Sequence, residues 1–338
     1  MSVNRSPCLW QLSVGPQVST LRPGSRQTSL FSLTGYDESV PHIKINWQSK
    51  LVLLLVLPFV GAGIVLEIHW WAVNLLQVVI WAVGLSFLLG LVVLKLRAAT
   101  PAGAFAGAAI TASLIFSTLT YPYLPWRTAL GPVLTVALLA HFSTRLGRAK
   151  KQQLGTAEKR QGRTTAQVAA NLGVAALAAN ELLRSWLIDS GWFPQQGTAQ
   201  MPLLAPVLSA LAEAAADTVS SEIGQVLGGK PRMITTLRSA EPGTDGAISL
   251  IGTAAGIAAA AIVAAVGTLA FSGKYFEVET FWVSTAGGVF GLLFDSLLGA
   301  TLERRGWLNN DLVNFLSTVS AAAFSLGVLA VLPHPGVG

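Results

Sequence analysis

Nine long apolar stretches, separated by short polar segments, follow one another from residue 51 onward. A helix needs about 20 apolar residues to cross the hydrocarbon core of a bilayer, and most of these stretches approach that length. Only 11% of the residues are charged, against about 25% in a typical soluble domain, so a water-soluble fold would expose large apolar patches. The sequence therefore predicts an all-α, polytopic helical membrane protein with about nine transmembrane spans, at 51–68, 70–94, 102–120, 129–142, 166–188, 203–228, 247–271, 280–300 and 312–332.

The first 49 residues have a different composition from the rest. They are rich in Ser, Thr, Gly and Pro and contain no apolar run, which predicts a disordered polar tail rather than a signal peptide. Residues 50–338 are expected to form a single transmembrane helical domain. Cys8 is the only cysteine of the sequence, so no disulfide can form within the chain.

Basic residues are concentrated in alternate polar segments. If the tail lies in the cytoplasm, nine spans place 19 of the 22 Lys and Arg residues on that side, in the tail and in segments 95–101, 143–165, 229–246 and 301–311. Cytoplasmic loops of membrane proteins carry such an excess of positive charge. The distribution predicts an N-in/C-out topology. The net charge of +6 then reflects topology, and no nucleic-acid partner is expected.

Carboxylates are the second informative feature, because ionisable groups within membrane spans are costly and commonly functional. Asp217 and Asp295 stand in apolar spans with no cation nearby in the sequence, so we expect both to be functional. Asp245 precedes the seventh span, where it is also a candidate helix cap. The carboxylates that converge on the predicted cytoplasmic face are Glu213, Asp217, Glu222, Asp245, Asp295, Glu303 and Asp311.

Such a group of carboxylates needs positive charge from a divalent metal, from the basic loops or from protons. Mg²⁺ typically uses one or two protein carboxylates and bridges to phosphate groups. The adjacent segments also supply cations suited to phosphate, namely Lys150, Lys151, Arg163, Lys230 and Arg232. No Walker A motif or kinase glycine-rich loop is present. The residues therefore predict a nucleotide or phospholipid-headgroup site of another architecture, at the membrane surface.

Several short motifs occur in a fixed order between residues 90 and 330. The most specific is ADTVSSEIG at 216–224, which is followed by GTDGAIS at 243–249 and DSLLGA at 295–300. Two further motifs, GRTTAQVAANLG at 162–173 and NNDLVN at 309–314, contain Asn171, Asn310 and Asn314. In order and spacing, these motifs resemble those of the integral-membrane family typified by transmembrane protein 19 and the plant phytyl-phosphate kinase of tocopherol synthesis.

The resemblance implies a prenyl-phosphate kinase, which transfers a phosphoryl group from CTP, UTP or ATP to a membrane isoprenoid monophosphate and gives the diphosphate. In this hypothesis Asp217, Glu222 and Asp295 hold Mg²⁺ and act, together with Asp245, as the catalytic carboxylates. The residues expected to bind the phosphates of the nucleotide and the lipid are Lys150, Lys151, Arg163, Asn171, Lys230, Arg232, Asn310 and Asn314. The expected location is the bacterial inner (plasma) membrane, with the site facing the cytoplasm.

The same carboxylates leave a second function open, a cation- or proton-coupled transporter or lipid flippase. Transporter sites tend to lie near the bilayer midplane between structural repeats. Here the carboxylates crowd the inner ends of the spans, which favours chemistry at the membrane surface. A third alternative, a non-catalytic scaffold, would leave Asp217 and Asp295 without a role.

Overall fold

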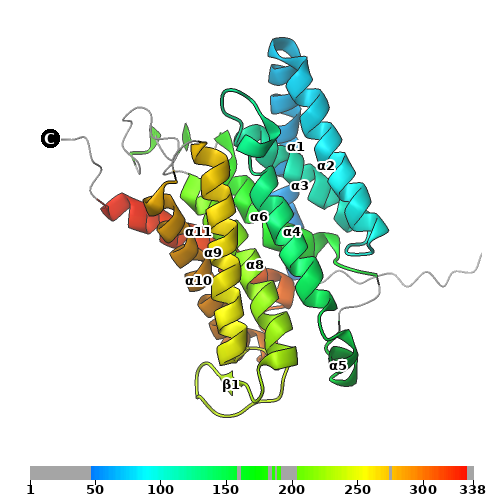
Figure 1. Cartoon of the computed structure of the whole chain (residues 1–338), viewed down its shortest axis with the longest axis vertical. Coiled ribbons are helices and arrows are strands. Elements are labelled where there is room, and N and C mark those ends of the chain that lie inside the picture. Colours follow the sequence, from blue (N-terminus) through cyan, green and yellow to red (C-terminus); the bar gives the residue numbers. More distant parts are fainter. Residues whose placement is uncertain are drawn as a thin grey trace, which may run out of the picture. The chain divides into compact units, whose positions relative to one another are not determined.

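The computed structural model describes residues 47–157, 161–181, 185–186, 189–191, 204–273 and 276–332, which form a helical bundle with one small two-stranded sheet (Figure 1). Most of the predicted tail, residues 1–46, lies outside the described residues. Its last three residues are helical, because the side chains of Gln48 and Ser49 are held by the far end of the chain. Gln48 Nε2 donates to the Trp307 carbonyl oxygen at 2.7 Å, and Ser49 Oγ donates to Asp311 Oδ2 at 2.5 Å.

Each predicted span coincides with a helix over the described residues. These helices are α1 (Trp47–Asn74), α2 (Leu76–Lys95), α3 (Pro101–Ser117), α4 (Leu130–Arg145), α6 (Thr165–Ala179), α8 (Leu204–Leu227), α9 (Leu250–Ser272), α10 (Val278–Leu298) and α11 (Asn310–Val331). The connecting segments contain the 3₁₀ turn η1 (Pro125–Arg127), the short helix α5 (Arg148–Gln153), the strands β1 (Arg232–Met233) and β2 (Ala247–Ile248), and the π-helical turn η2 (Gly299–Glu303).

Five of these helices are long and apolar enough to cross a membrane by length and composition, namely α1, α2, α9, α11 and α10 together with η2. The apolar helices α3 and α6 are shorter, with 17 and 15 residues. The chain is therefore helical and rich in membrane-length apolar helices, while the nine-span N-in/C-out topology stays a prediction.

Several predicted span boundaries differ from the observed helix ends. The fifth span was predicted to reach residue 188, but α6 ends at Ala179, where the backbone of Asn180 becomes extended. Two other differences have a clear structural cause. The sequence predicts a break at residue 69, but α1 continues to Asn74. Trp71 is buried in that last part of α1 and its Nε1 donates to Glu67 at 3.0 Å, which favours continued helix. At the other boundary, residues 247–248 form β2 and pair with β1, so α9 begins three residues later, where Ser249 caps it by accepting from Gly252 N at 3.1 Å.

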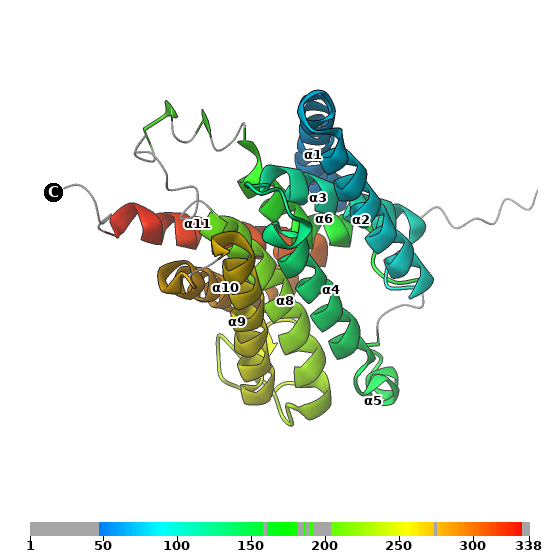
Figure 2. The ribbon, with the colours of Figure 1, turned by 45° about the horizontal axis from the view of Figure 1, so that its top comes forward.

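Helix α8 is the centre of the bundle and is covered by α4, α6, α9, α10 and α11. Figure 2 shows α8 between α4 and α9. Every residue of α8 from Leu204 to Ala216 is buried. Because neighbouring helices shield α8 from its surroundings, it tolerates polar side chains that a lipid-facing helix would not.

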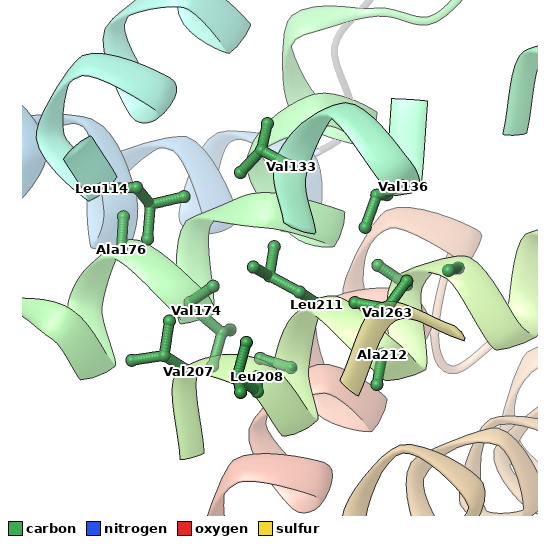
Figure 3. Close-up of a cluster of buried hydrophobic side chains, with 14 of the residues drawn as sticks. Leu114, Val133, Val136, Val174, Ala176, Val207, Leu208, Leu211, Ala212 and Val263 are labelled. Atoms are coloured by element: carbon green, nitrogen blue, oxygen red, sulfur yellow. The ribbon is translucent and has the colours of Figure 1, made fainter. Parts of the chain in front are cut away.

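The core around α8 consists mainly of Val, Ala and Leu side chains (Figure 3). Leu208 and Leu211 of α8 lie fully buried in the same cluster as Val174 of α6 and Val263 of α9. Small residues permit close helix contacts, since a Cβ added at Gly256 of α9 would lie 2.9 Å from the Ala216 carbonyl oxygen. This packing fixes α8 and therefore the positions of the carboxylates that it carries.

The polar segments predicted to share one side of the membrane gather at one end of the bundle. Arg163 forms backbone hydrogen bonds with the α2–α3 connection, donating to Ala98 O at 3.0 Å and accepting from Thr100 N at 2.9 Å. Lys150 Nζ donates to Val226 O at 2.7 Å, and Gly246 packs directly on the backbone of Ala300. Segment 229–246 meets two other basic segments, since Gly243 packs on the Thr156 side chain and Arg304 Nη1 lies 3.7 Å from Met233 Sδ. With the Gln48 and Ser49 contacts above, the described parts of all five basic segments are thus in contact.

We expect Gly246→Ala to destabilise the protein much more than Gly306→Ala. Both glycines have positive φ, +73° and +71°, and this conformation costs an alanine about 1–2 kcal/mol. A Cβ at Gly246 would also collide with the backbone of Ala300, whereas a Cβ at Gly306 has nothing within 4 Å. Thermal unfolding in detergent measures both losses, and equal losses would contradict the tight contact between the 242–246 turn and η2.

Candidate functional site

A polar cavity of about 260 Å³ lies at this end of the bundle, between α8, the loop 231–249, α10 with η2, and the start of α11. It brings together five of the residues predicted from the sequence, namely Asp217, Asp245, Asp295, Asn310 and Asn314. Glu303, which the sequence placed in the carboxylate group without assigning it a role, lines the same cavity. We call this space the carboxylate cavity, after Asp217, Asp245, Asp295 and Glu303.

Local structure explains how carboxylates so distant in sequence converge. Asp295 lies in the last turn of α10, and the chain then changes from α- to π-helical geometry so that Glu303 also reaches the cavity. Single π-helical turns occur frequently at functional sites. Asp245 lies in a tight turn between Gly243 and Gly246, whose φ angles of +86° and +73° favour glycine.

The carboxylates lie close enough for their charges to repel one another. The charges of Asp217, Glu213 and Glu303 all act on Asp295, and those of Asp245 and Asp217 act on Glu303. The positive charge of Arg163 attracts the Asp217 carboxylate and offsets part of this repulsion. The Oδ2 atom of Asp295 is buried and has no hydrogen-bond partner among the described residues. Gathered negative charge with an unpartnered oxygen at a polar cavity favours a bound cation.

The carboxylates of the cavity meet only part of what a divalent metal requires. Within the described ranges, no three His, Cys, Asp or Glu side chains stand close enough together to hold a metal ion by themselves. Mg²⁺ commonly keeps several waters and uses only one or two carboxylates, with substrate phosphates completing the coordination. Asp217 and Asp295 therefore suit a divalent metal that keeps waters or other ligands better than a metal ion held by protein side chains alone.

Glu222, predicted as the third metal ligand, does not line the carboxylate cavity. Its carboxylate forms an ion pair with Lys151 and accepts a hydrogen bond from Thr144 Oγ1 at 3.0 Å. The Lys151 side chain is only 1% exposed, and its Nζ also donates to Ser143 O at 2.8 Å. The five-residue spacing from Asp217 turns Glu222 about 140° around α8. The structure thus places Glu222 and Lys151 in a buried link between α4, α5 and α8.

We expect Lys151→Met to destabilise the protein by about 3–5 kcal/mol, because it leaves the partly buried Glu222 carboxylate without its counter-charge. Replacing both partners, as in Lys151→Met with Glu222→Met, should recover much of that loss because no uncompensated charge remains. Thermal unfolding of the two variants in detergent measures the difference. An unchanged melting temperature in the single variant would contradict the structural role of the pair.

The other predicted phosphate-binding cations lie outside the carboxylate cavity. Lys150 bonds to a backbone carbonyl at the end of α8, and Lys230 is exposed. Arg232 is exposed as well, and its Nη1 donates to Leu237 O at 3.2 Å. Arg163 is partly buried and donates from Nη2 to Thr218 Oγ1 at 3.3 Å, beside Asp217. Of the predicted cations, Arg163 is thus the one that the structure places near the carboxylates.

A second, larger cavity of about 490 Å³ lies between α2, α3, α4 and α6 and reaches α8 at Ala214. Its lining includes two of the residues predicted to bind phosphate, Arg163 and Asn171. Its lining also includes Arg97, Arg145 and Arg148, which lie in the predicted cytoplasmic segments 95–101 and 143–165 and were not predicted as site residues. We call it the arginine cavity, after these three and Arg163. Their position at the ends of α2 and α4, beside the Gly/Ala-rich start of α3, is the sequence signal that could have identified them.

A helical bundle with membrane-length apolar helices and a carboxylate-lined cavity at one end defines a polytopic integral membrane protein with a polar site. The chain belongs to the integral membrane protein family DUF92, whose sequence profile matches residues 84–322. That range contains every described residue that lines the two cavities and excludes α1.

Relatives of the chain come from archaea, cyanobacteria and plants. The uncharacterized membrane protein MJ0933 of Methanocaldococcus jannaschii is 42% identical over 125 residues, which is 37% of this chain and 49%, about half, of that protein. The uncharacterized membrane protein sll0875 of Synechocystis is 32% identical over 221 residues, 64% of this chain and 79% of that protein. Protein VTE6, chloroplastic, of Arabidopsis thaliana is 30% identical over 216 residues, 62% of this chain and 60% of that protein. No solved structure matches the chain.

Proposed function

We propose that this protein is a membrane-bound prenyl-phosphate kinase, which transfers the γ-phosphoryl group of CTP, UTP or ATP to an isoprenoid monophosphate. The observation that carries the proposal is the gathering of Asp217, Asp295 and Glu303 around one polar cavity beside Arg163. The motif resemblance to the family of the plant phytyl-phosphate kinase supports the same reaction.

The carboxylate cavity offers groups of both kinds that a metal–nucleotide complex needs. Asp217 and Asp295 would hold Mg²⁺, which when bound neutralises charge on the β- and γ-phosphates. The side-chain amides of Asn310 and Asn314 supply neutral N–H donors for phosphate oxygens. Arg163 would counter the charge that develops on the transferred phosphoryl group.

The reaction needs positioning more than acid–base chemistry. A terminal oxygen of the lipid monophosphate forms a bond to the γ-phosphorus, while the bond from that phosphorus to the β–γ bridging oxygen breaks and the nucleoside diphosphate leaves. The monophosphate is already ionised near neutral pH, so no general base is required. The residues of the cavity therefore act by orienting the two phosphates and by balancing their charge.

The proposed orientation puts the carboxylate cavity at the cytoplasmic face, where the polar segments rich in Lys and Arg are expected. Soluble nucleotide would then reach the cavity from the cytoplasm. The proposed location is the inner (plasma) membrane of a bacterium. Cysteine labelling of single-cysteine variants at positions 230 and 306 in sealed membranes tests this orientation, since both are exposed at that end.

A direct assay tests the proposed reaction. The purified full chain is incubated in detergent with phytyl or geranylgeranyl monophosphate, Mg²⁺ and each nucleoside triphosphate in turn, and the lipid products are analysed by mass spectrometry. We expect a prenyl diphosphate with at least one nucleotide, and its loss on addition of EDTA. Absence of diphosphate with every nucleotide and every chain length would overturn the proposal.

One observation favours the transport alternative. Glu213 in the core of α8 is 1% exposed, accepts from Ser317 Oγ at 2.6 Å through Oε1, and has no hydrogen-bond partner for Oε2 among the described residues. A buried carboxylate next to the carboxylate cavity is the type of group that carries protons or cations in transporters. Flux of a lipid phosphate into proteoliposomes without nucleotide, abolished by Glu213→Gln, would support transport instead of phosphoryl transfer.

A further inference from the structure

The arginine cavity combines an apolar interior with a cationic entrance. Its deep walls are formed by Ala104, Val133, Val136 and Ala140, which are all buried. From Gly103 to Thr111 the lining follows α3 over nine residues, a rise of about 12 Å along the helix axis. The volume of about 490 Å³ lies within the range of roughly 300–1,000 Å³ found for small-ligand sites. The interior therefore has the size and polarity to hold an apolar chain.

Positive charge is confined to the end of this cavity near the polar segments. Arg97, Arg145 and Arg148 are exposed there, and Arg163 lies deeper, against α8. The described residues that line the cavity include no Asp or Glu. Arginine pairs well with phosphate because its planar guanidinium presents several N–H donors at once. The entrance is therefore complementary to an anionic phosphate group.

The walls of the arginine cavity suggest a side entrance for a lipid. Both α2 and α4 line it, yet α2 packs mainly on α1 and α3, while α4 packs mainly on α8 and α9. The outer surface of α2 near the cavity is apolar and exposed, as expected for a surface that faces lipid, and includes Phe87, Leu88 and Leu91. A chain anchored in the bilayer would thus approach the cavity from the side that carries α2.

From these observations we infer that the arginine cavity is the binding site of the lipid substrate, an isoprenoid monophosphate, whose chain lies along α3 while its phosphate contacts the arginines at the entrance. The inference deepens the proposed function and rests on it for the identity of the lipid. In this arrangement the lipid binds in the arginine cavity and the nucleotide binds in the carboxylate cavity. Arg163 belongs to the arginine cavity and also acts on Asp217 in the carboxylate cavity, so the two phosphates meet near its guanidinium.

Photolabelling of the wild-type protein tests the inference without requiring catalysis. The full chain in nanodiscs is irradiated with geranylgeranyl monophosphate that carries a diazirine on its prenyl chain, and labelled peptides are identified by mass spectrometry. We expect labels on α2, α3 and α4. Unlabelled geranylgeranyl monophosphate should reduce the labelling at least tenfold, whereas geranylgeraniol or inorganic phosphate at the same concentration should reduce it less than twofold.

Two matched variants test the cavity itself. Ala137→Trp fills it from α4, and Leu138→Trp adds the same ring to the adjacent position, which is 54% exposed and lines neither cavity. We expect labelling to fall at least tenfold in the first variant and to stay within twofold of wild type in the second. Melting temperatures show whether each variant is folded, and the labelled positions in wild type do not depend on either variant.

The outcomes separate this inference from the proposed function. Labels confined to other helices, or full competition by geranylgeraniol, would overturn the inference even if the diphosphate is formed. Protection by inorganic phosphate alone would show a site for free phosphate and would also overturn it. Labels in the cavity that only the lipid monophosphate displaces would support the lipid site even if no nucleotide gives the diphosphate, in which case the kinase reaction alone fails.

Discussion

Asp217→Asn and Asp295→Asn are each expected to reduce prenyl-phosphate kinase turnover by about 10²–10³-fold, the usual cost of losing one electrostatic group from an active site. Asparagine keeps the size of the aspartate side chain but removes the negative charge proposed to hold Mg²⁺. Asp295→Asn is the more direct test of a bound cation, because the buried Oδ2 atom of Asp295 has no hydrogen-bond partner among the described residues. Initial rates of diphosphate formation at saturating Mg²⁺ measure the effect.

A charge-neutralising variant elsewhere provides the control for these aspartates. Asp189 is exposed and lines neither cavity, so Asp189→Asn should change the rate less than twofold. The cavity variants should retain the wild-type elution volume, because each neutralises one of several mutually repelling carboxylates. Their melting transitions show whether each variant is folded, including Asp217→Asn, which also removes the charge that faces Arg163. Normal turnover in Asp217→Asn and Asp295→Asn would eliminate the carboxylate cavity as the catalytic site.

Arg163→Gln is expected to lower kcat/KM by about 10²-fold or more, because the guanidinium would stabilise charge on the transferred phosphoryl group. The backbone hydrogen bonds from Arg163 to the α2–α3 connection do not involve the side chain, so the loop should keep its position. If Arg163 lies between the two substrates, kcat should fall and the KM values for nucleotide and lipid should both rise. Steady-state kinetics with each substrate varied in turn provides these values.

Arg238→Gln is the matched control for Arg163, because Arg238 is exposed on the loop between β1 and β2 and lines neither cavity. Its kinetics should stay within twofold of wild type. A rise in the lipid KM alone in Arg163→Gln would limit this residue to lipid binding and contradict its position between the two phosphates. Wild-type kinetics in Arg163→Gln would remove it from the site altogether.

The class of the protein and several residues of the candidate site can be predicted from short segments of the sequence. Apolar runs of membrane length determine a helical membrane protein, because hydrocarbon admits only segments whose backbone groups are satisfied internally. Asp217 and Asp295 could be identified because a carboxylate in an apolar run is costly wherever the run packs. Asp245, Asn310 and Asn314 were found through motifs, and the structure places all five in the carboxylate cavity.

Other assignments required the packed structure. Glu222 belongs to the same motif as Asp217, yet its direction around α8 brings it to Lys151, which lies on a separate helix. Glu303 lines the carboxylate cavity from the π-helical turn that follows α10. Neither outcome can be deduced from composition, since each depends on the direction of a side chain relative to a distant element.

The sequence by itself determined that this chain is a helical membrane protein with carboxylates in its apolar segments, since the length of an apolar run and the position of a charge within it are local properties. Only the tertiary structure decided that four carboxylates line one cavity, that Arg97, Arg145 and Arg148 line a second and larger one, and that Lys151 is buried. The physical reason is that a cavity is a property of packing. It forms where helices distant in the sequence fail to fill the space between them, and their crossing positions are set by the whole bundle.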